Sequence, residues 1–233
     1  MVTRPVDITT TTSAKVPEHA FVVRRESKWS YLLVFKRWFD ICFSVLTLPL
    51  ALPFGLLVAL LIRIDSAGPV LIKVKRLGKG GSTLFKYKFR TMVPNAEEVL
   101  RNLLESNPEI RQEYERTYKI KQDPRITRLG RWLRLTSLDE LPQIINVFRG
   151  EMSWVGPRDI LDTELAKYRD FAPKFLTVQP GITGLWQVSG RSKLTYSERI
   201  QLDMEYIDHL SFFLDLKILC RTVPVVVTGY GAV

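Results

Sequence analysis

A run of twenty-two residues without a formal charge, from Ile41 to Ile62, constrains the fold of this chain more than any other feature. About twenty helical residues suffice to cross the hydrocarbon core of a bilayer. A helix buried in the core of a soluble protein is the alternative, but such helices rarely stay apolar on every face over this length. The run therefore predicts a helix that enters a membrane.

Two prolines and the flanking charges indicate how this helix enters the membrane. Pro49 and Pro53 lie near its middle, where each removes a backbone donor and clashes with the preceding turn, so we expect the helix to break there. Basic residues flank both ends, Lys36 and Arg37 before the run and Arg63 after it, which gives no positive-inside asymmetry. A re-entrant helix that leaves by the face it entered is favoured over a true span, because it keeps both basic flanks on the cytoplasmic surface.

The sequence on either side of this helix divides the chain into three parts. Residues 1–30 combine a threonine run with scattered charges and show no periodicity, which is typical of a disordered N-terminal tail. Residues 31–64 form the re-entrant membrane helix, and residues 65–233 form a cytoplasmic catalytic domain. We expect a mainly α monotopic membrane protein with a small β-hairpin and interfacial amphipathic helices.

Three stretches of the catalytic domain have a clear pattern. Residues 70–90 alternate apolar and basic side chains around a glycine-rich turn, which predicts two short strands joined as a hairpin. Residues 95–120 predict a solvated helix interrupted near Pro108. Residues 196–227 are helical in pattern, and their aromatic side chains suit either the membrane interface or the protein core.

Charge and composition limit the chemistry. The 34 basic and 24 acidic residues give a net charge of +10, which favours nucleic acid, anionic lipid or phosphorylated substrates as partners. Cys42 and Cys220 lie far apart, which argues against a disulfide framework or a zinc site. A Ser-His-Asp triad would have to use His209, beside Asp208, and is disfavoured because His19, the other histidine, lies in the polar tail.

The adjacent carboxylates Asp139 and Glu140 are the strongest candidates for chemistry. Pro142 is tolerated in the first turn of a helix, so a helix should begin near the pair and place both acids at its electropositive end. The alternative is a capping box, Ser137-x-x-Glu140, in which Glu140 only returns a hydrogen bond to the helix start. Many cations accompany the pair in sequence: Lys86, Lys88, Arg90, Arg131, Arg134, Arg149 and Arg158.

Seven ordered motifs give the chain a resemblance to a known family. They are KRWFD (36–40), the proline-containing apolar helix, DSAGPV (65–70), KYKFRTM (86–92), DPRITRLGRWLR (123–134), SLDELPQIINVFRGEMSWVGPR (137–158) and PGITGLWQVSGR (180–191). The chain resembles the bacterial sugar transferases, monotopic phosphoglycosyl transferases that prime exopolysaccharide, O-antigen and glycoprotein glycan assembly on a polyprenol phosphate. Ala67 and Asp159 depart from the family pattern, which has proline at both positions. The first should alter only a turn, whereas the second adds a negative charge beside an expected phosphate contact.

The resemblance implies a mechanism and a set of site residues. Asp139 would attack the sugar-linked phosphorus of a nucleotide diphosphate sugar and hold the sugar phosphate covalently, and Glu140 would assist it. A polyprenyl (undecaprenyl) phosphate would then take the sugar phosphate and become a polyprenyl diphosphate sugar. Mg²⁺ is the expected cofactor, with Asp139 and Glu140 as its ligands. The substrate-binding or phosphate-binding residues would be Lys88, Arg134, Arg158 and Asp215.

The resemblance also implies partners and a location. We expect a nucleotide sugar, UDP-linked, and inner-membrane lipids as partners, a homodimer, and an active site on the cytoplasmic face of the bacterial inner membrane. Galactose, glucose and N-acetylated sugars are all open as the transferred group. A multi-span transferase is excluded because a single long apolar segment cannot build a polytopic channel. A membrane-tethered scaffold that binds nucleic acid is disfavoured because the sequence has no recognition-helix or RNA-binding signature.

Overall fold

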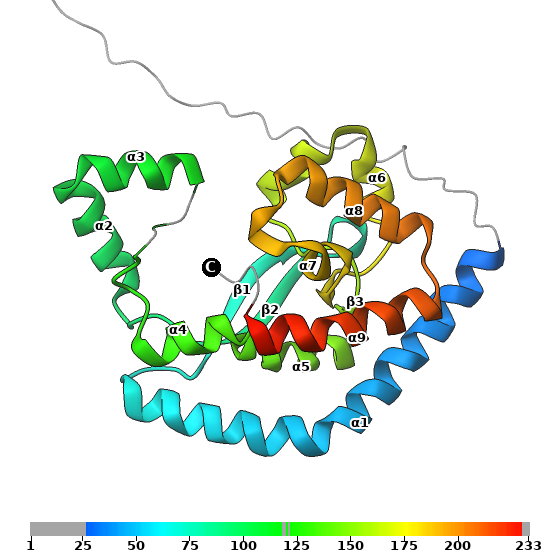
Figure 1. The fold of residues 1–233 in the computed structure, drawn as a ribbon, viewed down its shortest axis with the longest axis horizontal. Helices are drawn as coiled ribbons and strands as arrows, with labels where there is room; N and C mark the ends of the chain where they lie inside the picture. Colours follow the sequence, from blue (N-terminus) through cyan, green and yellow to red (C-terminus); the bar gives the residue numbers. More distant parts are fainter. Residues whose placement is uncertain (1–26, 118–119, 121, 230–233) are drawn as a thin grey trace, which may run out of the picture.

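The computed structural model describes residues 27–117, 120 and 122–229. These residues are mostly helical, with one small antiparallel hairpin, as the sequence predicts (Figure 1). The predicted tail, residues 1–30, lies outside the described residues except at its end, where the first helix begins at Ser27.

The long apolar helix α1 spans Ser27–Asp65 and is continuous through both Pro49 and Pro53. The prediction that it breaks at the prolines is therefore wrong, and Figure 1 shows a bend partway along it instead. In the turns before Pro49, the Ser44 and Thr47 hydroxyls donate to the carbonyls of Asp40 and Phe43 at 2.7 and 2.9 Å. Such bonds favour bending without ending a helix. Re-entrance itself stays a prediction.

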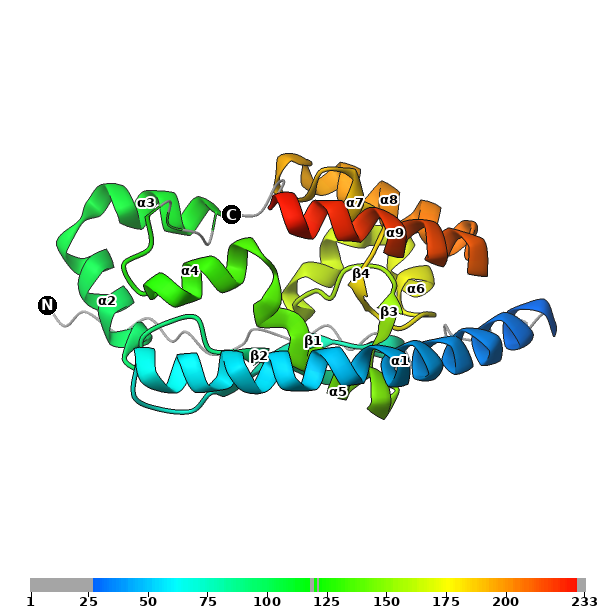
Figure 2. The same ribbon diagram turned by 60° about the horizontal axis from the view of Figure 1, so that its bottom comes forward.

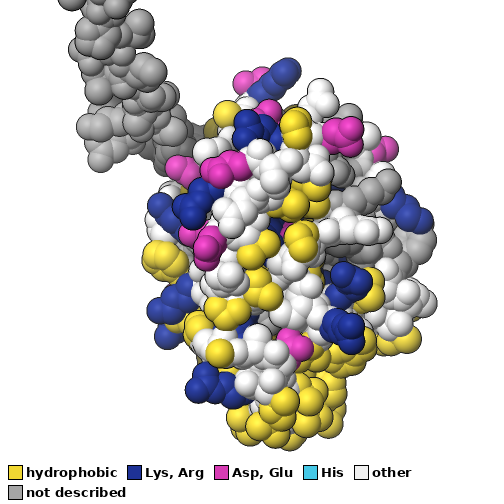
Figure 3. Space-filling model, turned by 90° about the vertical axis from the view of Figure 1, so that its left-hand side faces the viewer, with side chains coloured by type: hydrophobic (Ala, Val, Ile, Leu, Met, Phe, Trp, Pro, Cys, Tyr) yellow, Lys and Arg dark blue, Asp and Glu magenta, His cyan; other side chains and the backbone are white. Residues whose placement is uncertain are grey.

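Most of α1 is uncovered by the rest of the protein. Within its apolar segment, Val34–Asp65, only 11% of the most apolar window is buried, and no second helix of this length and hydropathy occurs in the described part of the chain. A helix in the core of a soluble protein would be mostly buried, so that alternative is not supported. Figure 3 shows hydrophobic side chains gathered along the bottom of the molecule, where α1 runs in Figure 1. The few buried apolar residues of α1 include Val58 and Ile62, which pack with Phe89 and Leu133.

The predicted hairpin is confirmed. Strand β1 (Leu71–Leu77) pairs antiparallel with β2 (Thr83–Phe89), with Leu71 opposite Phe89 and Leu77 opposite Thr83. The connection includes a short 3₁₀ turn, η1 (Lys79–Gly81), in which Gly80 and Gly81 have φ values of 68° and 79°. Glycine adopts such left-handed conformations without steric cost. In Figure 2 the hairpin lies behind α1, and Phe89 places the end of β2 against that helix.

Helices fill the middle of the chain. They are α2 (Ala96–Ser106), α3 (Pro108–Thr117), α4 (Arg128–Leu135), the 3₁₀ helix η2 (Leu138–Gln143) and α5 (Ile144–Arg149). The interruption predicted near Pro108 is confirmed, because α2 ends at Ser106 and α3 begins at Pro108 itself.

The C-terminal half adds two short parallel strands and the main core. Its elements are β3 (Ser153–Val155), η3 (Asp162–Phe171), α6 (Ala172–Phe175), β4 (Gly181–Thr183), α7 (Leu185–Ser189), η4 (Arg191–Lys193), α8 (Tyr196–Asp208) and α9 (Phe212–Thr228). The helical stretch predicted over 196–227 is thus two helices. Strands β3 and β4 pair in parallel, and a Cβ at Gly181 would lie 2.1 Å from the backbone nitrogen of Gly156. Only glycine allows this approach, which joins the WVGPR and PGITG motifs. Tyr206, Ile207 and Ile218 of α8 and α9 are buried in the largest core cluster.

Candidate active site

The acidic pair lies in the first turn of η2, which leads directly into α5. A helical element therefore begins beside Asp139 and Glu140, as predicted. The capping-box alternative is not borne out, because the Ser137 side chain makes no capping hydrogen bond. Ser137 has a left-handed backbone, with φ 57°, and its Oγ instead accepts a hydrogen bond from Arg191 at 2.8 Å. Glu140 is consequently available for another role.

One ammonium group bridges both carboxylates. Lys88 Nζ, at the end of β2, lies 3.0 Å from Asp139 Oδ2 and 2.7 Å from Glu140 Oε1. Burial alone would lower the pKa of Lys88, but the attraction of Glu140 and Asp139 outweighs it and raises that pKa. Lys88 is therefore a permanent cation at the pair.

The two carboxyl groups have different proton affinities. Burial raises the pKa of Asp139, and repulsion from Glu140 adds to the effect, against the opposing pull of Lys88. Burial acts on Glu140 too, but Lys88 and Lys86 outweigh it and lower the pKa of Glu140 to about 2. Because both carboxylates share Lys88, the two groups titrate as a linked pair.

A cleft of about 450 Å³ surrounds the pair and is rich in cations. Arg134 and Arg158 line it together with Lys88, Asp139 and Glu140, so the structure brings together five of the six predicted site residues. The guanidinium groups of Arg158 and Arg199 each lie 5.3 Å from the ring centre of Trp186. These contacts hold two planar cations at one wall, where their forked N–H groups suit bidentate phosphate binding.

A buried carboxylate positions Arg158. The backbone nitrogen of Arg158 donates to Asp203 Oδ1 at 3.2 Å, and the Tyr168 hydroxyl donates to Asp203 Oδ2 at 2.8 Å. Burial raises the pKa of Asp203 to about 7, although both hydrogen bonds and the nearby arginines oppose the shift.

The structure does not place Asp215 in this cleft. Asp215 is buried at the start of α9, where its Oδ2 lies 2.5 Å from Lys36 Nζ and its Oδ1 accepts a hydrogen bond from the Tyr206 hydroxyl at 2.8 Å. Lys36 belongs to α1, so this ion pair joins the apolar helix to the C-terminal helices. The geometry thus gives Asp215 a structural partner, and its predicted role in substrate binding stays a prediction.

Asp159, the unusual residue beside Arg158, is neutralised within the cleft. Its Oδ2 lies 2.7 Å from Lys86 Nζ and 2.9 Å from Arg76 Nε. Asp159 therefore adds no unpaired negative charge to the cleft, but its ion pairs engage Lys86 and Arg76, two cations of the cleft wall. Ala67, the other departure, lies in the bend that joins α1 to β1.

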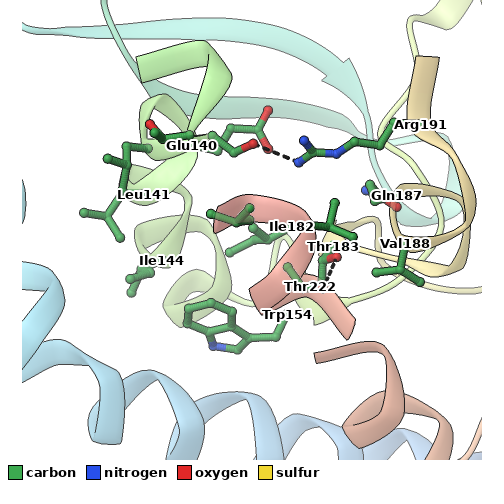
Figure 4. A pocket seen from close by; sticks show the side chains of 15 residues that line it. Glu140, Leu141, Ile144, Trp154, Ile182, Thr183, Gln187, Val188, Arg191 and Thr222 are labelled. Carbon is green, nitrogen blue, oxygen red and sulfur yellow. Dashed lines mark hydrogen bonds between the residues drawn. The ribbon is translucent and has the colours of Figure 1, made fainter. Parts of the chain in front are cut away.

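Several lining residues were not predicted from the sequence as site residues. Arg191 lies in the PGITGLWQVSGR motif and lines the cleft. In Figure 4, which shows a cavity next to the cleft, its side chain points toward the side of Glu140. Trp186 and Gln187, which also line the cleft, belong to the same motif. Membership of that motif could therefore have identified all three as site residues from the sequence. Arg199 and Arg76 lie in none of the motifs, so only the fold brings them to the cleft.

The carboxylate pair also suits a hard divalent cation. Mg²⁺ typically takes one or two protein carboxylates and completes its shell with water and substrate phosphates. Asp139 and Glu140 provide two adjacent carboxylates, each with one oxygen that Lys88 does not contact. No cluster of three histidine, cysteine or acidic side chains that could hold a metal occurs among the described residues, so water and substrate oxygens would supply the further ligands.

A carboxylate pair beside a cation-lined cleft suits an enzyme that acts on a phosphorylated substrate. Comparison with known proteins shows the family. The bacterial sugar transferase family matches residues 31–229, and the chain belongs to that family. The resemblance stated from the sequence is thus confirmed.

Curated relatives cover most of this chain. The undecaprenyl-phosphate galactose phosphotransferase of Salmonella typhimurium is 44% identical over 197 residues, which are 84% of this chain and 41% of that protein. The exopolysaccharide production protein ExoY of Sinorhizobium fredii is 41% identical over 197 residues, 84% of this chain and 87% of that protein. The undecaprenyl-phosphate glucose phosphotransferase of Komagataeibacter xylinus is 38% identical over 216 residues, 84% of this chain and 36% of that protein. The chain therefore spans less than half of the two phosphotransferases and most of ExoY.

Proposed function

We propose that this chain transfers a sugar 1-phosphate from a nucleotide diphosphate sugar, UDP-linked, to undecaprenyl phosphate. The products are a nucleoside monophosphate and undecaprenyl diphosphate sugar, the lipid on which exopolysaccharide or a related glycan is started. The observation that carries the proposal is the pair Asp139 and Glu140, held by Lys88 inside the cation-lined cleft. The names of the relatives support the lipid and the sugar phosphate.

The reaction uses Asp139 as a nucleophile in two displacements. In the first, a carboxylate oxygen of Asp139 forms a bond to the sugar-linked phosphorus, and the bond from that phosphorus to the nucleoside monophosphate oxygen breaks. In the second, an oxygen of the lipid phosphate attacks the same phosphorus, and the Asp139 carboxylate leaves. No water is consumed, and Asp139 returns to its starting state.

Cations make the first displacement feasible. A carboxylate 4 Å from one phosphate charge is repelled by about 4 kcal/mol at an effective dielectric constant near 20. Lys88, Arg134 and Arg158 line the cleft where the diphosphate would lie and offset this repulsion. Glu140 holds the Lys88 ammonium beside Asp139. When bound at the pair, Mg²⁺ supplies further neutralisation of the phosphate charge.

The membrane arrangement is part of the same proposal. The uncovered apolar surface of α1, with basic residues at both ends, supports a re-entrant helix in the inner membrane and an active site at its cytoplasmic face. Cysteines placed at the two ends of α1 should then react with an impermeant thiol reagent only from the cytoplasmic side. Reaction of one end from the periplasm would exclude re-entrance.

Intact-mass measurement tests the covalent step. Wild-type protein incubated with nucleotide sugar and Mg²⁺, without lipid, should gain the mass of one sugar phosphate, and Asp139→Asn should gain none. Asp208→Asn, an exposed carboxylate on α8 that pairs with Lys174, is the matched control and should behave like wild type. An adduct on Asp139→Asn would show that another residue is the nucleophile.

A further inference from the structure

A second cavity of about 300 Å³ adjoins the catalytic cleft and has a different character. Figure 4 shows it among η2, β4, α7 and α9. Most of its lining is apolar, including Leu141, Ile144 and Ile182 from the centre of the protein and Val225 and Val226 from α9.

The two cavities share part of their walls. Glu140 and Arg191 border both, together with Ser137, Ile182 and Gln187. Arg191 has a φ of 52°, a conformation that residues other than glycine rarely adopt, and its guanidinium donates to Ser137 at this border. A ligand with an anionic head at Arg191 would therefore have its adjoining chain in the apolar cavity.

Several polar groups in the wall of the apolar cavity are paired within the protein. The hydroxyls of Thr183 and Thr222 bond each other at 2.7 Å, and Trp154 Nε1 donates to Ser44 Oγ at 2.7 Å. Gln187 Oε1, in contrast, is buried without a hydrogen-bond partner in the structure and lies at the border shared with the cleft. A nucleotide base or a sugar needs polar partners along its edges, so the interior of this cavity suits a hydrocarbon.

The cavity also adjoins the membrane helix. Trp154 forms one wall (Figure 4). Its ring packs edge-to-face on Phe43 of α1, with ring centres 4.9 Å apart. On α9, Val226 lines the cavity, whereas the adjacent Val227 is 80% exposed. The cavity thus lies between the cleft and the apolar surface of the protein, as a lipid with its phosphate in the cleft requires.

We infer that this cavity binds the phosphate-proximal isoprene units of the polyprenyl phosphate acceptor, with the acceptor phosphate at Arg191. The inference rests on the proposed function and adds to it the place where the acceptor is recognised. A cavity of about 150 Å³ takes one benzene molecule, so about 300 Å³ holds about two five-carbon units. The remainder of the chain lies in the bilayer.

Filling the cavity tests this assignment in the full-length, detergent-purified protein. Val226→Trp should raise the KM for undecaprenyl phosphate at least tenfold and leave the formation of the sugar-phosphate adduct from nucleotide sugar alone unchanged. Val227→Trp places the same side chain on the exposed face of α9 and should match wild type. Impaired adduct formation in Val226→Trp would assign the cavity to the donor, and equal kinetics in the two variants would contradict any binding there.

Photolabelling of wild-type protein gives a result that does not depend on the variant folding or on turnover. A two-unit prenyl phosphate that carries a diazirine on its second unit should label Ile182, Trp154 or Val226, and undecaprenyl phosphate should compete. Labels confined to α1, or equal competition by phosphatidylglycerol, would overturn the inference. Because labelling needs no donor, a failure of the proposed function would appear separately, as wild-type protein that releases no nucleoside monophosphate from any nucleotide sugar.

Discussion

The buried ion pair between Lys36 and Asp215 allows the structural and substrate-binding roles of Asp215 to be separated. The two side chains are 9% and 4% exposed and lie 2.5 Å apart, so Asp215→Asn removes the ion-pair partner of the buried Lys36 ammonium and leaves it only the weaker interaction with the buried Asp40 on its own helix. Breaking a buried pair in this way costs about 3–5 kcal/mol. For a chain of this size that is a fall in melting temperature of roughly 6–20 °C.

Thermal unfolding of detergent-purified variants measures this cost. Asp215→Asn should unfold far below wild type, whereas the double variant Lys36→Met with Asp215→Asn should recover part of the loss because the buried ammonium is removed as well, while the buried Asp40 loses its interaction with Lys36. Asp208→Asn and Lys217→Met, at exposed positions, are matched controls and should shift the melting temperature little. At a temperature where Asp215→Asn is folded, its KM for nucleotide sugar should equal that of wild type. If Asp215→Asn raised the KM for nucleotide sugar and left the melting temperature unchanged, the structural role of Asp215 would be refuted and a role in substrate binding supported.

Three further predictions concern the cleft. In steady-state assays, Lys88→Met should lower kcat by about 10²–10³-fold, because it removes the cation that Asp139 and Glu140 share. Lys75 is an exposed lysine on the same hairpin, and Lys75→Met should have little effect. Asp203 has a folded-state pKa of about 7 against an ordinary value near 4, so its contribution to stability is full below pH 4 and is lost as pH rises through 7. Denaturant unfolding should therefore show wild type losing stability relative to Asp203→Asn across this range, and parallel pH profiles would contradict the shift. Asp159→Asn should lower the KM for nucleotide sugar several-fold by freeing Lys86 and Arg76 for the diphosphate, while Asp162→Asn should leave it unchanged; an increase in KM for Asp159→Asn would show that Asp159 itself assists donor binding.

The sequence predicted the features that depend on local pattern. The hairpin follows from apolar and basic alternation around glycines with positive φ, and the end of α2 follows from Pro108. The exposure of α1 follows from the length of its uncharged run. The acidic pair at a helical start was predicted because Pro142 restricts where that helix can begin.

Features that depend on tertiary contacts were missed or wrong. Strands β3 and β4 have three residues each and lie more than twenty residues apart, so their pairing leaves no periodic signal. The helix α1 was expected to break, but proline removes only one hydrogen bond, and the surrounding turns hold the helix through a bend.

The surroundings of individual site residues also depend on tertiary contacts that the sequence pattern does not show. Ser137 has the spacing of a capping box, but the turn after α4 gives it a left-handed backbone conformation. Its hydroxyl oxygen accepts a hydrogen bond from Arg191 in place of a backbone N–H group of the helix. Asp215 was assigned to the site through the resemblance to the family, and only the packing of α1 on α9 shows that its carboxylate forms an ion pair with Lys36. Arg199 enters the cleft because α8 passes beside Trp186, which no local pattern encodes.

The fate of the phosphorus nearest the sugar tests the central claim most directly. Wild-type protein with undecaprenyl phosphate and UDP-galactose or UDP-glucose, labelled at that phosphorus, should transfer the label to the lipid and release uridine monophosphate. Omission of the lipid should stop net turnover after one equivalent. If the label stays in the nucleotide and uridine diphosphate is released, the enzyme transfers the sugar without its phosphate, and the role of Asp139 as a nucleophile at phosphorus is contradicted.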